Sequence, residues 1–149
     1  MGFSLLTQSF RDEVTRLGVQ ELRTPEEVDT LLTNTKGAVL VFVNSVCGCA
    51  GGVARPGLAL ALKHKTVPDK LTTVFASEDR EATARAREYF EDMPPSSPSI
   101  ALLRDGKLVH MIHRHQIEIS TPQGVAAMLT EAFDKYCRTE APQPTPATR

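Results

Sequence analysis

The chain has 149 residues, of which 41% are hydrophobic and 23% charged, and its formal net charge at pH 7 is −1. This composition is typical of one globular domain with its own core. A near-neutral charge argues against nucleic acid and anionic membranes as partners, because both attract cationic surfaces. No apolar run approaches the ~18 residues of a membrane-spanning helix, and the first residues lack the pattern of a signal peptide.

The first third of the chain predicts two helices with a short strand between them. Apolar residues at helical spacing predict an amphipathic helix over residues 3–17, and a short run at 19–22 predicts an edge strand. Thr24 followed by Pro25 marks a helix start, because threonine is a favourable N-cap and proline is tolerated in the first turn. Gly37 is expected to end this second helix.

The centre of the chain joins a buried strand to a pair of cysteines. Residues 39–43 are apolar and mostly β-branched, which predicts a strand buried on both faces. Two cysteines around one glycine follow at 47–49, and helical spacing begins at residue 53. Pro56 must either kink this helix or mark its true start, after an irregular turn at residues 51–52.

The second half of the chain predicts a strand, a helix, a hairpin and a last helix. These are a strand at 71–75, a helix from Ser77 to about Phe90, a proline-rich loop at 93–98, hairpin strands at 99–104 and 107–112 joined by Asp105-Gly106, and a helix that starts at Ser120 or Thr121. The whole order predicts an α/β fold with a central mixed sheet and helices on both faces. One domain over residues 1–138 and a disordered proline-rich tail over 139–149 complete the expected organisation.

The three cysteines predict catalytic or metal-binding chemistry in a reducing cytosol. Their odd number and close spacing do not fit the disulfide framework of a secreted domain. Cys47 stands at the start of a helix, where backbone N–H groups and the helix dipole favour thiolate over thiol, so it is the expected nucleophile. Cys49 is the natural second thiol. Burial of both as small hydrophobic side chains is the alternative interpretation.

This order of elements resembles the thioredoxin fold, in which redox cysteines follow a core strand and a cis-proline precedes the hairpin strand. Within that superfamily, two segments resemble the bacilliredoxin family: Asn-Ser-Val-Cys-Gly-Cys-Ala-Gly-Gly-Val-Ala-Arg-Pro at 44–56 and Pro-Pro-Ser-Ser-Pro-Ser-Ile-Ala-Leu at 94–102. The resemblance covers residues 3–138 and extends the fold expectation to a thioredoxin-like domain with an extra N-terminal helix.

The same resemblance implies a cytoplasmic thiol–disulfide oxidoreductase that works without a cofactor. Cys47 would attack mixed disulfides between protein cysteines and bacillithiol, or a similar low-molecular-weight thiol, and free the protein. Cys49 or a second small thiol would then regenerate Cys47. A general thiol–disulfide isomerase is the alternative. The oligomeric state is not predicted.

The spacing of the two cysteines bears on the type of exchange. A disulfide between Cys47 and Cys49 closes a ring of about 11 atoms, tighter than the roughly 14 of a Cys-x-x-Cys pair. Gly48 is the residue that can bend enough to permit this ring. Because a strained disulfide is more easily reduced, the pair is expected to be less reducing than thioredoxin. That property suits isomerisation or removal of a small thiol better than bulk reduction.

Several further residues are candidates for the substrate site. Pro98 is expected to lie against the cysteine turn, with the backbone of Ser97 facing an extended substrate, although a trans-proline in a rigid loop would serve only structure. Arg55 could hold the thiolate or a carboxylate of the small thiol, or be a surface arginine. Cys137 is expected to pack on the last helix, with a resolving thiol as the alternative.

The histidines of the predicted hairpin raise a different hypothesis. In a strand, His113 and His115 share one face and His110 takes the other, and solvated side chains are the expected interpretation. Together with the two cysteines, they could instead supply zinc ligands. Two rival functions follow: a non-catalytic metal-binding module, and a thioredoxin-like interaction scaffold with an unreactive Cys47.

Overall fold

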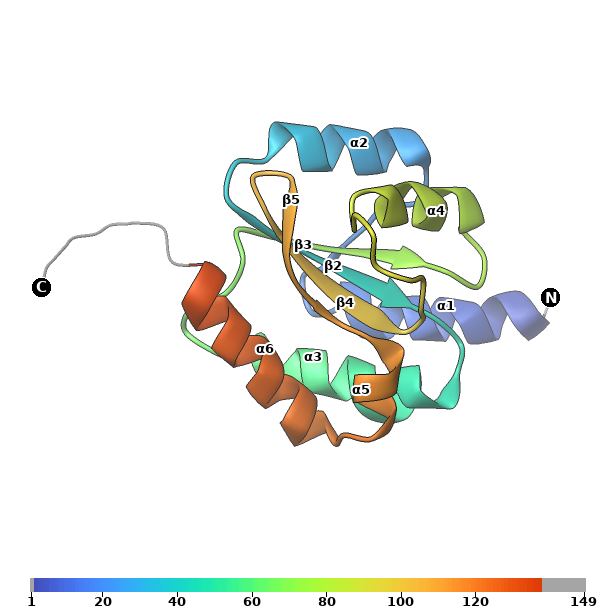
Figure 1. Ribbon diagram of the computed structural model, residues 1–149. Coiled ribbons are helices and arrows are strands. Elements are labelled where there is room, and N and C mark those ends of the chain that lie inside the picture. The colour runs from blue at the N-terminus through green and yellow to red at the C-terminus, as the bar shows by residue number, and fades with distance from the viewer. Residues whose placement is uncertain (1, 138–149) are drawn as a thin grey trace, which may run out of the picture.

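The computed structural model describes residues 2–137, which form one five-stranded mixed sheet with helices on both faces (Figure 1). The elements are α1 (Gly2–Thr15), β1 (Gln20–Glu21), α2 (Pro25–Asn34), β2 (Ala38–Asn44), the π-helical turn η1 (Ala50–Ala54), α3 (Arg55–Ala61), β3 (Lys70–Phe75), α4 (Arg80–Glu88), β4 (Ser99–Arg104), β5 (Lys107–Ile112), α5 (Arg114–Glu118) and α6 (Pro122–Tyr136). The predicted fold class is confirmed. The predicted tail at 139–149 lies outside the described residues.

Strand β2 is the centre of the sheet, whose order is β1-β3-β2-β4-β5. It pairs in parallel with β3 and antiparallel with β4, and all seven of its residues are buried. Successive side chains alternate between the two faces, so Leu40 and Phe42 enter one part of the core and Val41 and Val43 the other. The short β1 lies at the edge beside β3, as the sequence predicts.

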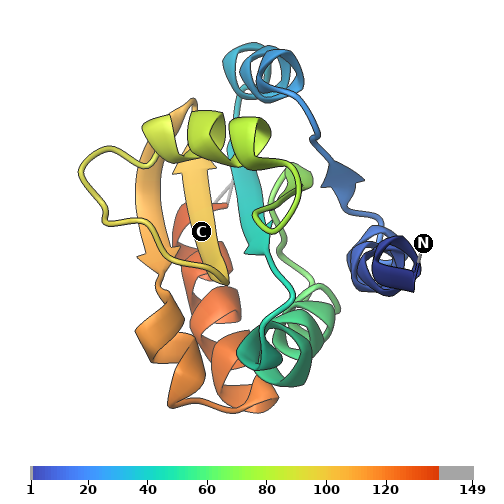
Figure 2. The ribbon, with the colours of Figure 1, turned by 90° about the vertical axis from the view of Figure 1, so that its right-hand side faces the viewer.

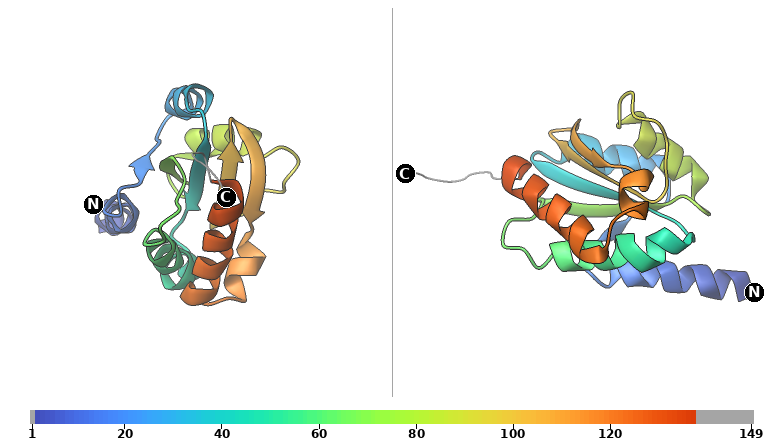
Figure 3. Two further views of the ribbon diagram at one scale, coloured as in Figure 1. Left: turned by 90° about the vertical axis from the view of Figure 1, so that its left-hand side faces the viewer. Right: turned by 60° about the horizontal axis from the view of Figure 1, so that its bottom comes forward.

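The helices form one layer on each face of the sheet (Figures 1 and 2). Helices α2 and α4 pack side by side over one face. Helices α3 and α6 pack together over the opposite face, as Figure 3 shows, and α1 contacts α3. No helix within residues 2–137 is long and apolar enough to cross a membrane.

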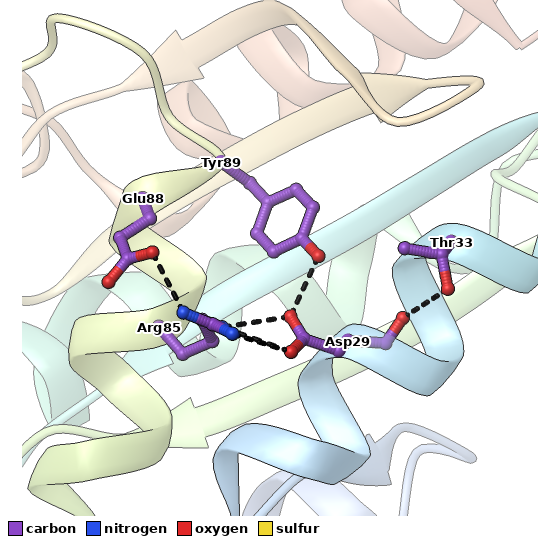
Figure 4. Close-up of a pocket in the computed structure, with 5 residues that line it drawn as sticks. All are labelled: Asp29, Thr33, Arg85, Glu88 and Tyr89. Carbon is purple, nitrogen blue, oxygen red and sulfur yellow. Dashed lines mark hydrogen bonds and ion pairs between the residues drawn. The ribbon is translucent and has the colours of Figure 1, made fainter.

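The contact between α2 and α4 is fixed by one carboxylate, that of Asp29 (Figure 4). Arg85 donates to it from Nε and Nη2, each at 2.9 Å, and the Tyr89 hydroxyl donates at 2.8 Å. The hydrogen bonds from Arg85 and then from Tyr89 hold the pKa of Asp29 below its usual range. These residues line a surface pocket of about 410 Å³ that contains no cysteine, and their mutual bonding fits a structural tie between the two helices.

Helix α1 is fastened to the domain by the buried guanidinium of Arg11. Its side chain is 2% exposed and bonds to three carboxylates: Glu21 at 2.6 Å, Glu78 at 2.7 Å and Asp79 at 2.8 Å. The guanidinium also lies 4.6 Å from the ring centroid of Phe75. One arginine therefore ties α1 to β1, to the end of β3 and to the start of α4.

The structure corrects two local predictions. Helix α4 begins at Arg80 with Asp79 at the N-cap position, so the prediction of Ser77 as its cap is wrong. The Ser77 hydroxyl instead accepts a hydrogen bond from Val46 N at 3.2 Å, next to the cysteine turn. Strand β5 ends at Ile112, and the short helix α5, which was not predicted, follows it.

The N-cap of α2 and the hairpin turn agree with the sequence. The Thr24 hydroxyl accepts from Glu27 N at 3.2 Å, as expected for the cap of α2. Asp105 and Gly106 have φ angles of 54° and 83°, the left-handed conformation that a tight two-residue hairpin turn requires.

Candidate active site

The cysteine turn connects the central strand to a helix that begins irregularly. The chain leaves β2 at Asn44, passes through Cys47 and Cys49, and enters η1 before α3 starts at Arg55. Pro56 stands in the first turn of α3, directly after the π-helical turn. The backbone is already helical at residues 48–54, so Pro56 marks the change from the irregular turn to the regular helix and not the start of helical structure. Single π-helical turns of this kind are frequent at functional sites.

Gly51 is required where this turn approaches Arg55. A Cβ atom at position 51 would lie 2.7 Å from Arg55 Nη2, closer than real Cβ contacts allow. The arginine has little freedom to move away, because its side chain is only 4% exposed and is bonded on several sides. Arg55 can therefore occupy its buried position only because residue 51 is glycine.

The two sulfur atoms of the turn lie together and are partly exposed. Cys47 Sγ and Cys49 Sγ are 3.1 Å apart, and both residues are free thiols. This separation allows a hydrogen bond between them and is longer than the roughly 2.05 Å of a disulfide bond. The structure therefore brings the two predicted catalytic residues together, with Gly48 between them.

The surroundings shift the pKa values of the two thiols in opposite directions. Partial burial alone raises the pKa of Cys47, but hydrogen bonds from Ser45, from the Cys49 thiol and from two backbone N–H groups lower it by more. Burial, followed by the hydrogen bond with Cys47 and the charge of Cys47, raises the pKa of Cys49. Cys47 is consequently the more acidic thiol of the pair, the one that ionises first, and Cys49 the less acidic one.

Ser45 lowers the pKa of Cys47 and is itself bonded to Asn44 at the end of β2. Its hydroxyl accepts from Cys47 N at 3.4 Å, and its own N–H donates to Asn44 Oδ1 at 2.9 Å. Replacing Ser45 by alanine removes a hydrogen bond that lowers the pKa of Cys47. We expect the midpoint of Cys47 alkylation against pH, measured by intact mass in a Cys49→Ala background, to move to higher pH.

The control for this prediction is Ser77→Ala. It removes a hydroxyl that bonds to Val46 N in the same turn but does not act on the Cys47 sulfur. A midpoint that moves equally in both variants would show that the hydroxyls support only the shape of the turn.

Arg55 lies behind the turn and holds it from inside the fold. Its Nη1 donates to Asn44 Oδ1 at 2.9 Å and to Ser45 O at 3.0 Å, and its Nε pairs with Glu13. The guanidinium also lies 4.6 Å from the ring centroid of Phe10. A side chain buried in this way positions the residues before Cys47, in place of the contact with thiolate or small thiol that its place in the sequence suggested.

The predicted cis-proline is present at the same edge of the sheet. The Ser97–Pro98 peptide bond is cis, and Ser99, which follows it, pairs with Val43 near the end of β2. The Ser97 carbonyl accepts from Arg114 Nη1 at 3.2 Å. The Ser97 N–H makes no hydrogen bond to any of residues 2–137.

Arg114 is a residue of this site that sequence reasoning missed. It belongs to α5, which packs against η1, and its Nε donates to Glu118 Oε2 at 2.9 Å. The hydrogen bond to Glu118, followed by the charges of Cys47 and Cys49, raises the pKa of Arg114. A five-residue helix is too short to show periodicity, so only its position shortly after the hairpin signals it.

The three histidines do not gather at the cysteines. His110, on β5, stacks on Tyr136 of α6 with 6.2 Å between ring centroids. His113 is the N-cap of α5 and His115 lies within it, so the prediction that they share a strand face is wrong. Their rings stack 5.9 Å apart. Among residues 2–137, no three His, Cys, Asp or Glu side chains are grouped so that they could hold a metal ion.

Cys137 packs in the core at the end of α6, 5% exposed. Burial is the main cause that raises its pKa to about 12. A thiol this weakly acidic supplies almost no thiolate at neutral pH, which agrees with the predicted packing role.

Known proteins resemble the chain over most of its length. A family model described as Disulphide isomerase matches residues 3–137. A bacilliredoxin of Symbiobacterium thermophilum is 58% identical over 125 residues, which cover 84% of this chain and 89% of the relative. Bacilliredoxins of Koribacter versatilis and Geobacillus kaustophilus are both 54% identical, over 85% and 89% of this chain and 88% and 90% of those relatives.

Solved structures confirm the thioredoxin-like fold. Thioredoxin of Malassezia sympodialis matches with a TM-score of 0.57 at 14% identity, over 80% of this chain and 91% of that structure. Thioredoxin of Fasciola hepatica matches with a TM-score of 0.56 at 20% identity, over 79% and 99%. Together with the sequence relatives, and with a paired thiolate and thiol at the helix start, these matches lead to one assignment. The chain belongs to the bacilliredoxin family of thiol–disulfide oxidoreductases.

Proposed function

We propose that this protein removes bacillithiol, or a similar low-molecular-weight thiol, from mixed disulfides on proteins. The observation that carries the proposal is the pairing of Cys47, whose pKa is lowered, with Cys49, whose pKa is raised, at 3.1 Å. Such a pair holds one sulfur ready to attack while the other stays protonated. The bacilliredoxin relatives, at 54–58% identity, support the choice of bacillithiol.

The proposed reaction is a disulfide exchange in two steps. The Cys47 thiolate attacks the small thiol's sulfur in the mixed disulfide, a new S–S bond forms, and the old bond breaks. Its electron pair leaves on the protein's cysteine, which then takes a proton. Cys49 next attacks Cys47 Sγ and releases the small thiol, or a second small thiol attacks the sulfur of the bound small thiol and releases Cys47 as thiolate. An external thiol reductant supplies the two electrons that reduce a Cys47–Cys49 disulfide to the two thiols.

Other parts of the site have roles in the same proposal. The free Ser97 N–H beside Pro98 would pair with the extended backbone of the target protein, and Gly48 would bend to admit both the substrate and the tight disulfide. Cys47 and Cys49 are the catalytic residues. The reaction is proposed for the cytosol, where reduced small thiols are abundant.

The test uses one carrier protein with a single cysteine, capped either with bacillithiol or with glutathione. A Cys49→Ala variant is incubated with each, and intact mass follows the adduct on Cys47. We expect the bacillithiol adduct to form much faster, with no adduct in a Cys47→Ser, Cys49→Ala control. No adduct from either carrier would contradict the proposal.

A general thiol–disulfide isomerase is the second candidate, favoured by the family model's description as Disulphide isomerase. Equal rates from the two capped carriers would support it and remove the specificity for bacillithiol. Recovery of activity from a scrambled disulfide substrate is the direct measurement of this second function.

A further inference from the structure

A groove of about 390 Å³ opens next to the cis-proline loop. Residues 94–96 of the loop form one wall, and His113, Arg114, His115 and Glu118 form the other. The groove therefore lies between the loop that leads to Pro98 and α5, which packs against η1, the helical turn that follows the cysteines.

Arg114 presents an unused hydrogen-bonding edge in this groove. Its Nε is bonded to Glu118, and its Nη1 to Ser97 O. Within residues 2–137, the Nη2 group has no hydrogen-bond partner, and the side chain is 44% exposed. The two bonds that do form favour one orientation of the guanidinium plane and leave the Nη2 donors unpaired.

The charge of Arg114 also reaches the reacting sulfurs. Its cation lowers the pKa of Cys49, against the larger effect of burial, and the sulfur charges in turn raise the pKa of Arg114. The geometry agrees, because Arg114 Nη1 is bonded to Ser97 O, next to the cis-proline, and α5 packs against η1, which follows the cysteines.

We propose that this groove binds the small thiol of the mixed disulfide, and that Arg114 Nη2 takes a carboxylate of that thiol. The inference rests on the proposed function and adds to it a specificity-determining residue: Arg114, which would favour small thiols that carry a carboxylate over neutral ones. A planar guanidinium with fixed orientation is the side chain best suited to this group. The stacked rings of His113 and His115 supply a flat wall beside it.

Binding of the small thiol in the groove favours attack on that thiol's sulfur and leaves the exchange chemistry as proposed. With the small thiol in the groove, Cys47 Sγ bonds to the small thiol's sulfur as the mixed disulfide breaks. The electron pair and then a proton go to the departing protein cysteine. No further oxidant or reductant enters this half-reaction.

The experiment compares two caps of similar size on the same carrier protein, 3-mercaptopropionate and 2-mercaptoethanol. Rates of adduct formation on Cys47 are measured by intact mass in a Cys49→Ala background, and corrected for the thiolate fraction of each variant. Arg114→Gln should slow capture of the carboxylate cap by about tenfold, the size expected for one charge-assisted hydrogen bond. Capture of the neutral cap should change less than twofold.

Lys107→Gln is the matched control, because it removes one positive charge at the hairpin turn, at the opposite end of β4 from Pro98. It should alter neither rate. Arg114→Lys keeps the positive charge but loses the planar guanidinium with its paired donors. It should therefore recover only part of the rate of capture of the carboxylate cap.

Two outcomes would overturn the groove proposal and leave the proposed function standing. If Arg114→Gln slows capture of both caps equally, Arg114 supports only the loop. If it slows capture of neither cap, Arg114 does not contact the small thiol. Failure of the parent protein to take any cap would remove the proposed function as well.

Discussion

Replacing Cys47 by serine should reduce transfer of the small thiol to below about 1% of the parent rate, because a serine hydroxyl neither ionises near neutral pH nor forms a bond to sulfur that exchange can reverse. Cys47 is the more acidic thiol of the pair, because hydrogen bonds from Ser45 and Cys49 favour its charged form. The measurement is release of the carrier protein from its capped form under multiple turnover, with excess reductant.

The other two cysteines separate the roles of the thiols. Cys49→Ala should still complete the first step and, without a thiol reductant, accumulate the Cys47 adduct at one transfer per molecule. With excess reductant, loss of turnover in this variant would assign the second step to Cys49, and retained turnover would assign it to a second small thiol. Cys137→Ala should leave the transfer rate unchanged, because Cys137 is buried with a pKa of about 12. Substantial transfer by Cys47→Ser would assign the nucleophile to Cys49 instead.

Replacing Arg11 by methionine should lower the free energy of unfolding by about 3 kcal/mol, the size seen when one partner of a buried ionic cluster is removed. Methionine can fill the space over Phe75, but it leaves Glu21, Glu78 and Asp79 without their shared cation. Urea unfolding followed by circular dichroism gives the difference directly.

The control is Arg16→Met, which changes an exposed arginine just after α1 whose Nε bonds to a backbone carbonyl, and it should cost far less. The difference between the Arg11 variant and the parent should also depend on pH. The hydrogen bond from Arg11 holds the pKa of Glu78 below its usual range, so this stabilisation is present above about pH 5 and fades as falling pH protonates Glu78. A constant difference down to pH 3 would mean that packing, not charge, fastens α1.

The parts of the fold that the sequence predicts well carry their signals within a few residues. The buried run of β2, the Thr24 cap and the Asp105-Gly106 turn each depend on local backbone and burial preferences. The cis-proline at position 98 was identified through the resemblance of its motif. The paired cysteines were predicted from both their local position after a buried strand and the resemblance of their motif.

The parts that the sequence does not predict depend on contacts between distant segments. Arg55 is directed by Glu13, 42 residues away, so its place behind the turn has no local signature. Helix α5 has five residues and is held by the burial of Ile117, which a periodicity analysis cannot detect. Arg114 joins the site only because α5 packs against η1 and reaches the loop at Ser97.

The close approach of Gly51 to Arg55 has a consequence for how this protein can vary. Arg55 is enclosed by its bonds to Glu13, Asn44 and Ser45, so any side chain at position 51 displaces it. A change at one of these two positions alters the cost of a change at the other. Libraries that randomise the cysteine turn should therefore vary residues 51 and 55 together, because single substitutions at position 51 will sample mostly variants with a displaced arginine.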